Sequence, residues 1–175
     1  AEALSANARL VMIHALNPYG FAVLRRANED NVDLNRNFID FSGPLPVNPD
    51  YDRVRTALVP PDPATWPQAA GELAALREAL GRERFERAFS GGQYQDPAGL
   101  FYGGTAPSWS RRALEHLFDE WSLGDRERIA VVDFHTGLGP FGYGELICDH
   151  PPDSAGARLA RRWFGDSVTE QALGT

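Results

Sequence analysis

The sequence predicts an α/β sandwich, because apolar runs typical of buried strands alternate with segments that have helical spacing. Leu10–Ile13 is a continuous apolar run bounded by polar residues, as expected of a strand buried on both faces of a parallel sheet. Ile129–Phe134, which is apolar except for Asp133, is expected to be the second buried strand. The chain has 175 residues, of which 43% are hydrophobic and 11% aromatic, so it can bury a sizeable core. We interpret it as a single domain.

The segments between these two strands carry distinct local signals. A turn signal at residues 17–20, Asn-Pro-Tyr-Gly, ends the first strand. Residues 28–41 mix polar groups with isolated apolar anchors, which favours an ordered loop, whereas residues 44–63 contain six prolines and are expected to be irregular. Pro67 opens an amphipathic helix whose apolar face carries Leu73, Leu76 and Leu80.

The second half of the chain continues the alternation. Residues 91–104 are rich in glycine and aromatic residues, as in a loop that packs closely against another segment. Thr105 or Ser108 could cap the helix that follows this loop. A third strand is expected at Glu145–Cys148 and a closing helix at Ala155–Phe164.

The composition excludes several classes of function. The net charge is −7, the sequence pI is about 5.0 and no basic run is present, so nucleic acid is not an expected partner. No apolar run approaches the ~20 residues of a membrane span, so a membrane is not expected either. All 17 basic residues are arginine, which excludes Schiff-base chemistry and a P-loop. The one cysteine, Cys148, cannot form an internal disulfide, which agrees with a reducing compartment such as the cytoplasm.

Two groups of side chains are candidates for chemistry. His135 follows the second predicted strand, where α/β folds place their sites, and could ligate a metal with Asp133 orienting it. The alternative is a structural histidine satisfied by the backbone. Arg26, Asn35 and Arg36 could grip a carboxylate or stabilise an oxyanion. The alternative for these three is a solvated loop in which the arginines pair with neighbouring carboxylates, namely those of Glu29, Asp30 and Asp33.

Three further side chains are weaker candidates. His14 could line the same pocket as His135, or could make a hydrogen bond in the core. His150 is a loop histidine that could bind a metal. Glu145 could act as a general base if it reached the pocket, and is otherwise an exposed strand residue.

Several motifs resemble a known family. Residues 17–21, Asn-Pro-Tyr-Gly-Phe, and residues 32–38, Val-Asp-Leu-Asn-Arg-Asn-Phe, are similar to signatures of the zinc carboxypeptidase superfamily. The closer resemblance is to a carboxypeptidase-like branch defined as a domain of unknown function. It is carried by residues 14–18, residues 99–104 (Gly-Leu-Phe-Tyr-Gly-Gly) and residues 133–139 (Asp-Phe-His-Thr-Gly-Leu-Gly). The resemblance extends from about Arg9 to Cys148.

The resemblance implies a fold, an activity and roles for the candidate residues. The fold would be a three-layer sandwich with a mixed, mostly parallel central sheet. The activity would be that of a zinc-dependent amide hydrolase acting on a small peptide or acylated amino acid with a free carboxylate. In the active site of the family, His135 matches the third zinc ligand. Asn35 and Arg36 match the pair that binds the terminal carboxylate of the substrate, and Arg26 matches the arginine that polarises the scissile carbonyl.

The sequence also departs from the family pattern. The first two zinc ligands of the family come from a His-x-x-Glu motif, and no histidine precedes Arg9. The general-base glutamate of the family lies on a late strand, which is expected beyond residue 175. We therefore expect residues 1–175 to form a single partial catalytic domain, an internal fragment that is inactive by itself. There are two alternatives. One is an N-acyl amino acid deacylase similar to succinylglutamate desuccinylase and aspartoacylase, because residues 33–36 also match the signature of those enzymes. The other is a truncated, non-catalytic carboxylate-binding protein.

Overall fold

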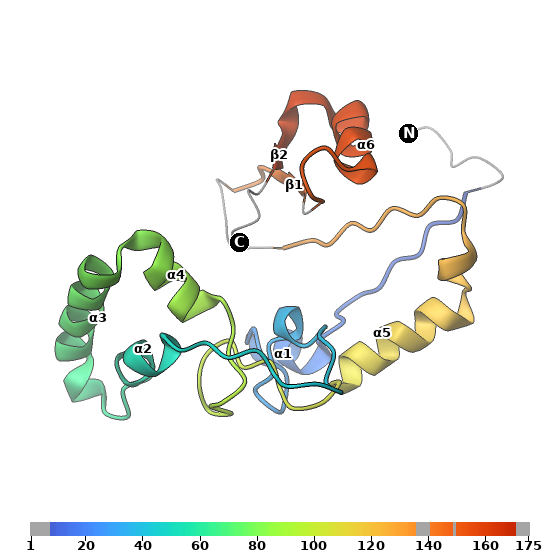
Figure 1. The fold of residues 1–175 in the computed structure, drawn as a ribbon. Coiled ribbons are helices and arrows are strands. Elements are labelled where there is room, and N and C mark those ends of the chain that lie inside the picture. The colour runs from blue at the N-terminus through green and yellow to red at the C-terminus, as the bar shows by residue number, and fades with distance from the viewer. Residues whose placement is uncertain (1–7, 136–140, 149, 171–175) are drawn as a thin grey trace. The chain divides into compact units, whose positions relative to one another are not determined.

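The computed structural model describes residues 8–135, 141–148 and 150–170 (Figure 1). Its internal contacts divide the chain into two units, Ala1–Arg128 and Ile129–Thr175. Among the described residues, no helix is both long enough and apolar enough to cross a membrane.

The first unit consists of helices, short 3-10 turns and long ordered loops. Its helices are α1 (Pro18–Val23), α2 (Tyr51–Leu58), α3 (Trp66–Leu80), α4 (Arg82–Ser90) and α5 (Trp109–Glu120). Its 3-10 turns are η1 (Leu34–Arg36), η2 (Pro63–Thr65) and η3 (Leu123–Asp125).

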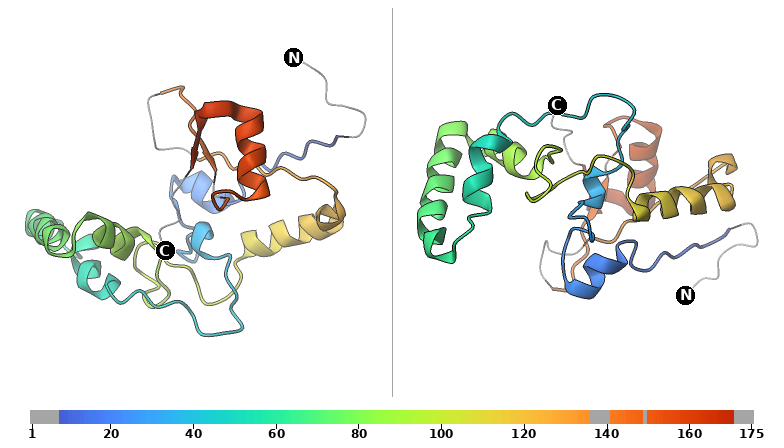
Figure 2. Two further views of the ribbon diagram at one scale, coloured as in Figure 1. Left: turned by 45° about the horizontal axis from the view of Figure 1, so that its top comes forward. Right: turned by 90° about the horizontal axis from the view of Figure 1, so that it is seen from below.

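The helices α2, α3 and α4 pack around one apolar core and lie together in both views of Figure 2. Tyr51, Val54 and Ala88 are buried at its centre, and Leu73 and Leu76 of the predicted amphipathic helix pack against them. The helix expected from Pro67 is thus confirmed as α3. The prediction of an irregular segment at residues 44–63 is wrong for α2. The six prolines of this segment lie on either side of the helix and not within it.

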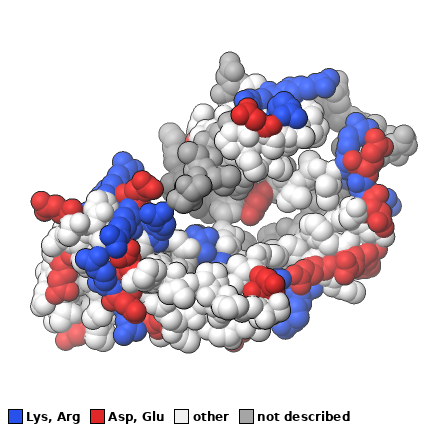
Figure 3. Space-filling view, viewed as in Figure 1, with Lys and Arg blue, Asp and Glu red and all other residues white. Residues whose placement is uncertain are grey.

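An ion pair ties the start of α2 to α4. The two carboxylate oxygens of Asp50 accept hydrogen bonds from Nε and Nη2 of Arg84, at 2.7 and 2.9 Å. The hydrogen bond from Arg84 lowers the pKa of Asp50 below its ordinary value, and the positive charge of Arg84 acts in the same direction. Acidic and basic atoms are interspersed over this part of the surface, as Figure 3 shows.

Side-chain caps fix the starts of α1 and α5 in the first unit. Asn17 Oδ1 accepts a hydrogen bond from Gly20 N at 2.9 Å, so the predicted turn also begins the short helix α1. Ser108 caps α5, since its Oγ accepts from the backbone N–H of Arg111 at 3.3 Å. Of the two caps predicted for this helix, Ser108 is therefore confirmed.

The second unit contains a small parallel sheet. Strand β1 (Leu146–Cys148) pairs with β2 (Val168–Glu170), with Leu146 opposite Val168, and helix α6 (Ala155–Phe164) lies between them in the sequence. This connection is a βαβ unit, in which parallel strands are joined through a helix. The predicted third strand and closing helix are confirmed, and the fold has α/β character.

The two long buried strands expected at residues 10–13 and 129–134 are not formed. Neither segment belongs to a strand, and their apolar side chains are exposed; Met12 is 83% exposed and Val131 72%. An apolar run predicts burial but does not supply the neighbouring strand whose hydrogen bonds define a sheet. Within the part of the chain that the structure describes, no strand pairs with either segment.

The Asp50–Arg84 pair predicts a pH-dependent difference in stability. Because the pKa of Asp50 is lowered in the folded state, its stabilisation is present above the ordinary aspartate range and is lost as the pH falls through the folded pKa. Asp50→Asn is therefore expected to lower the Tm at pH 7 by a few degrees, with the gap to the wild type closing in acid.

The matched control is Asp52→Asn, because Asp52 is 65% exposed and lies 3.6 Å from Arg55. Thermal unfolding followed by circular dichroism at several pH values measures both variants. A gap for Asp50→Asn that is equal at every pH would contradict the role of this ion pair.

Candidate carboxylate-binding site

The loop that carries the candidate arginines is ordered by two asparagines. Asn28 is buried, and its Oδ1 accepts hydrogen bonds from Val32 N at 2.8 Å and Asp30 N at 3.1 Å. Asn31 adopts a left-handed backbone with φ of 60°, and its Nδ2 donates to the carbonyls of Pro97 and Gly99, both at 2.9 Å. The ordered loop predicted at residues 28–41 is thus confirmed, and it is fastened to the loop at residues 91–104.

Asn37 joins the same loop to the start of α5. Its side chain is fully buried, and its Nδ2 donates to the carbonyls of Gly103 and Ala106 at 2.8 and 3.0 Å. Its Oδ1 accepts from the backbone N–H of Ser108 at 2.8 Å. One amide side chain therefore satisfies three backbone groups, which in a buried loop would otherwise lack partners.

Gln93 organises the loop at residues 91–104 from within. Its buried Oε1 accepts from the backbone N–H groups of Gln95 and Asp96, at 3.0 and 2.8 Å. The backbone carbonyl of Gln93 accepts from Gly103 N at 2.8 Å. A Cβ atom at Gly103 would lie 2.1 Å from the Tyr94 ring, so the close packing predicted for this glycine-rich segment is confirmed.

Asp33 lies where these two loops meet. Its side chain is 4% exposed, and its backbone N–H donates to the carbonyl of Tyr102 at 2.7 Å. Its Oδ1 accepts from Asn35 N at 3.0 Å, and its Oδ2 accepts from Arg26 Nε at 2.9 Å. This single buried carboxylate therefore holds both the candidate arginine and the start of η1.

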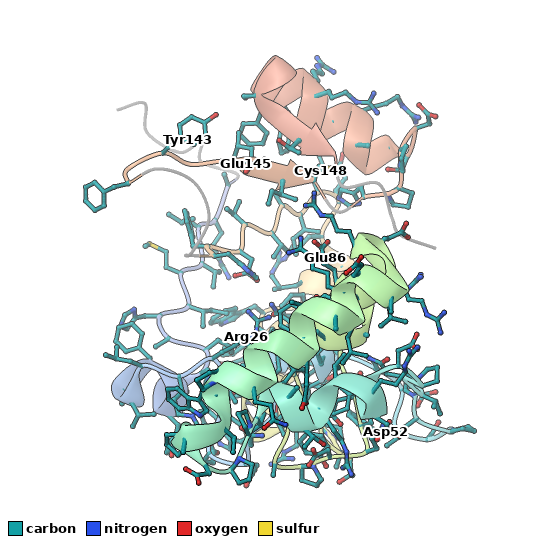
Figure 4. The ribbon with its side chains drawn as sticks, turned by 90° about the vertical axis from the view of Figure 1, so that its left-hand side faces the viewer. Arg26, Asp52, Glu86, Tyr143, Glu145 and Cys148 are labelled. Atoms are coloured by element: carbon teal, nitrogen blue, oxygen red, sulfur yellow. The ribbon has the colours of Figure 1, made fainter. Side chains whose placement is uncertain are left out.

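Arg26, labelled in Figure 4, has a contact on one edge and on one face of its guanidinium. Its Nε donates to Asp33, its Cζ lies 5.3 Å from the centre of the Phe101 ring, and its side chain is 53% exposed. No hydrogen bond from Nη1 or Nη2 of Arg26 to another described residue is present. Bidentate binding of a carboxylate uses parallel N–H groups of this kind.

Arg36 has partners that Arg26 lacks. Its Nη2 donates to the carbonyl of Ser90 at 2.6 Å, and its Nη1 donates to the carbonyl of Asn35 at 3.2 Å. Its Nε is buried and has no partner among the described residues. Arg36 thus fastens η1 to the end of α4, in addition to any contact with a ligand.

Tyr94 fixes the backbone beside Arg36. Its hydroxyl donates to the carbonyl of Arg36 at 2.5 Å. Burial raises the pKa of Tyr94, whereas the positive charge of Arg36 acts in the opposite direction. The hydroxyl therefore stays protonated at neutral pH and remains a donor.

The structure brings three of the four predicted site residues together. In the first unit, Arg26 binds the Asp33 side chain through its guanidinium, whereas Asn35 and Arg36 bind Asp33 through their backbone N–H groups. The side chain of Asn35 is exposed. The ion pair with Asp33 that the solvated-loop alternative predicted is present, between Arg26 and a carboxylate that is buried and not solvated. Glu29 and Asp30 form no ion pair within the described part of the chain.

The fourth predicted residue, His135, belongs to the second unit. Its Nε2 lies 2.9 Å from Asp133 Oδ2, so the predicted orienting contact is present, with both side chains mostly exposed. Glu145, just before β1, accepts from Thr169 Oγ1 at 2.9 Å (Figure 4). The core hydrogen bond suggested for His14 is wrong, because its ring is exposed and packs edge-on against Phe21 at 5.2 Å.

All 175 residues match a family model described as "Protein of unknown function (DUF2817)". The chain belongs to this family. Comparisons with curated proteins and with solved structures find no match.

The described residues do not form a zinc site by themselves. A catalytic zinc ion takes three protein ligands and a water. Over residues 8–135, 141–148 and 150–170, no three His, Cys, Asp or Glu side chains gather closely enough to hold a metal ion. Asp133 and His135 supply one oriented histidine.

The position of Asn37 predicts a large effect on stability. Asn37→Ala would remove the partner of the buried Gly103 carbonyl, of the buried Ser108 N–H and of the partly buried Ala106 carbonyl, and is expected to lower the free energy of unfolding of this DUF2817 protein by about 3 kcal/mol. Urea denaturation measures the change.

Asn35→Ala is the matched control, because the Asn35 side chain is exposed and removing it should change stability by less than about 0.5 kcal/mol. Equal effects of the two substitutions would show that Asn37 does not organise the loops.

Proposed function

We propose that this DUF2817 protein is an amide hydrolase of carboxypeptidase type, which acts on a small peptide or acylated amino acid with a free carboxylate. One observation carries the proposal. The guanidinium of Arg26 is fixed by a buried carboxylate and an aromatic face, while its terminal nitrogens have no hydrogen-bond partner among the described residues and could bind a ligand. A surface arginine that served only solubility would not need two such supports.

The charges around Arg26 suit an anionic ligand. Arg26 and Asp33 balance one another, and Arg36 adds a second guanidinium on the same loop. Asn35 adds an exposed amide that can donate to an oxygen without adding charge. An arginine held in this way can bind a carboxylate through two parallel hydrogen bonds, or can stabilise the oxyanion that develops on a carbonyl under attack.

We assign these two tasks to different residues. Arg26, whose terminal nitrogens are open, would stabilise the oxyanion at the scissile carbonyl. Asn35 and Arg36 would hold the terminal carboxylate of the substrate. Arg36 already donates once from each terminal nitrogen to a backbone carbonyl, so only its remaining N–H groups could reach a ligand.

The zinc dependence in this proposal is supported by the motifs and by the contact between Asp133 and His135. A carboxylate on one ring nitrogen is the usual support of a metal-binding histidine, and it leaves Nδ1 for the metal.

The proposal includes the architecture of the zinc carboxypeptidase superfamily. In a three-layer sandwich with a mostly parallel sheet, each of the exposed apolar segments at residues 10–13 and 129–134 would be a strand with hydrogen-bonded neighbours. Such pairing would bury the side chains that are exposed in these two segments.

The free, buried Cys148 agrees with a reducing compartment, and we propose the cytoplasm.

Two related functions would use the same arginine site. An N-acyl amino acid deacylase also has to hold a free carboxylate, and its signature matches Asp33 to Arg36. A non-catalytic carboxylate-binding protein would need Arg26, Asn35 and Arg36 without any metal. Comparing the hydrolysis of short peptides with that of N-acyl amino acids separates the first two functions, and carboxylate binding without hydrolysis of either identifies the third.

The role of Arg26 predicts the effect of its removal. In the natural protein supplied with Zn²⁺, Arg26→Ala is expected to lower kcat by about 10²-fold, because a contact made in the transition state is lost. Initial rates on a short peptide and on an N-acyl amino acid measure this effect.

Arg25→Ala is the matched control, because Arg25 is the neighbouring arginine and its Nη2 donates to Asn31 Oδ1 at 3.0 Å. Its kcat should stay within about twofold of the wild type. The assignment fails if Arg26→Ala retains the wild-type kcat, or if both arginine variants lose activity equally.

A further inference from the structure

Phe101 has a backbone conformation that a bulky residue rarely adopts. Its φ is 53°, in the left-handed region, where the Cβ of an L-residue crowds its own backbone. Such a conformation persists only when the surrounding structure imposes it, and it is concentrated at functional sites. The sequence offers glycines close by at residues 99, 103 and 104, yet a phenylalanine occupies this position.

Hydrogen bonds on both sides hold Phe101 in this conformation. Its carbonyl accepts from Gln93 N at 3.1 Å, and the preceding carbonyl, of Leu100, accepts from Gln93 Nε2 at 3.3 Å. The following carbonyl, of Tyr102, accepts from Asp33 N at 2.7 Å. The backbone of Tyr102, next to Phe101, is therefore hydrogen-bonded to Asp33, the residue that binds Arg26.

The ring of Phe101 connects Arg26 to the helical core. Arg26 Cζ lies 5.3 Å from the centre of this ring. The ring also contacts Phe89 of α4 edge to face, at 5.5 Å and 79° between the planes. Phe89 in turn packs against the core formed by Tyr51, Val54 and Ala88. A packed aromatic chain thus runs from the core to the face of the guanidinium.

We propose that Phe101 is a positioning residue, which fixes the plane of the Arg26 guanidinium so that its terminal nitrogens point toward the bound carboxylate or oxyanion. The inference rests on the proposed function of Arg26 and deepens it. Asp33 fixes one edge of the guanidinium, which alone would still permit rotation about the Nε–Oδ2 contact. A ring on one face removes that freedom, and the ring keeps its own place through the strained backbone and Phe89.

Hydrogen exchange at Arg26 Nε–H tests the proposal without any need for activity. This N–H donates to Asp33, so its exchange with solvent reports how firmly the guanidinium is held. Arg26→Lys identifies its nitrogen resonance in the full chain. Phe101→Leu is expected to accelerate the exchange by about fivefold, the factor typical of a cation–π contact at a partly exposed site. Phe101→Tyr, which keeps the ring, should restore slow exchange.

A fluorinated ring provides a second variant that keeps the packing. Incorporation of 3,5-difluorophenylalanine at position 101 withdraws electron density from the ring face and weakens its attraction for a cation, with little change in shape. Faster exchange at an unchanged Tm supports the proposal, even if Phe101→Leu fails to fold. Exchange that is unchanged by fluorination overturns it, as does a failure of Phe101→Tyr to restore slow exchange.

The two proposals fail in distinguishable ways. If the exchange rate follows the ring at position 101 but Arg26→Ala retains full kcat, then Phe101 positions Arg26 and the proposed hydrolase role of Arg26 is wrong. If the exchange rate is the same in all variants at position 101 while Arg26→Ala loses activity, the proposed role of Arg26 stands and Phe101 is only a packing residue. For a positioning residue, the fluorinated variant should also lower kcat more than it raises KM.

Discussion

The buried carboxylate of Asp33 is the interaction on which the proposed site depends. Burying an ionised carboxylate costs several kcal/mol unless charged or polar hydrogen bonds compensate it. Asp33 has both kinds, from Arg26 Nε and from the backbone N–H of Asn35, and its own N–H is bonded to Tyr102. Because each of these partners belongs to a different part of the loops, satisfying one buried charge places all of them relative to one another.

The surroundings of Asp33 are held by polar side chains more than by an apolar core. Asn28, Asn37 and Gln93 are all buried, and each is bonded to the backbone of one or more loops. A network of this kind is specific, since each donor and acceptor fits one partner, and it tolerates the loss of few members. The apolar core at α2, α3 and α4 contributes through Phe89 and Phe101, which carry its packing to Arg26.

Local patterns predicted the helices α3, α5 and α6 and the strand β1, because periodicity and caps are written within each segment. They failed for α2, whose flanking prolines resemble those of an irregular segment, and for residues 10–13 and 129–134, where pairing depends on a partner strand. The gathering of Arg26, Asn35 and Arg36 was predicted from their spacing in a short loop. The roles of Asn37 and Phe101 could not be predicted from the sequence, because their partners are distant along the chain. The partners of Asn37 lie 66 to 71 residues away, and Phe101 lies 75 residues from Arg26.

The most direct test of the account is the affinity of the Asp33→Asn variant for an N-acetyl amino acid, measured by calorimetry on a protein whose fold has been verified. The substitution removes a negative charge next to Arg26 but keeps the shape of the side chain. If Asp33 acts by placing the guanidinium, the variant binds the carboxylate about tenfold more weakly than the wild type, although its site has become more positive. Equal or tighter binding would mean that charge alone attracts the ligand, and would contradict the central role given to Asp33.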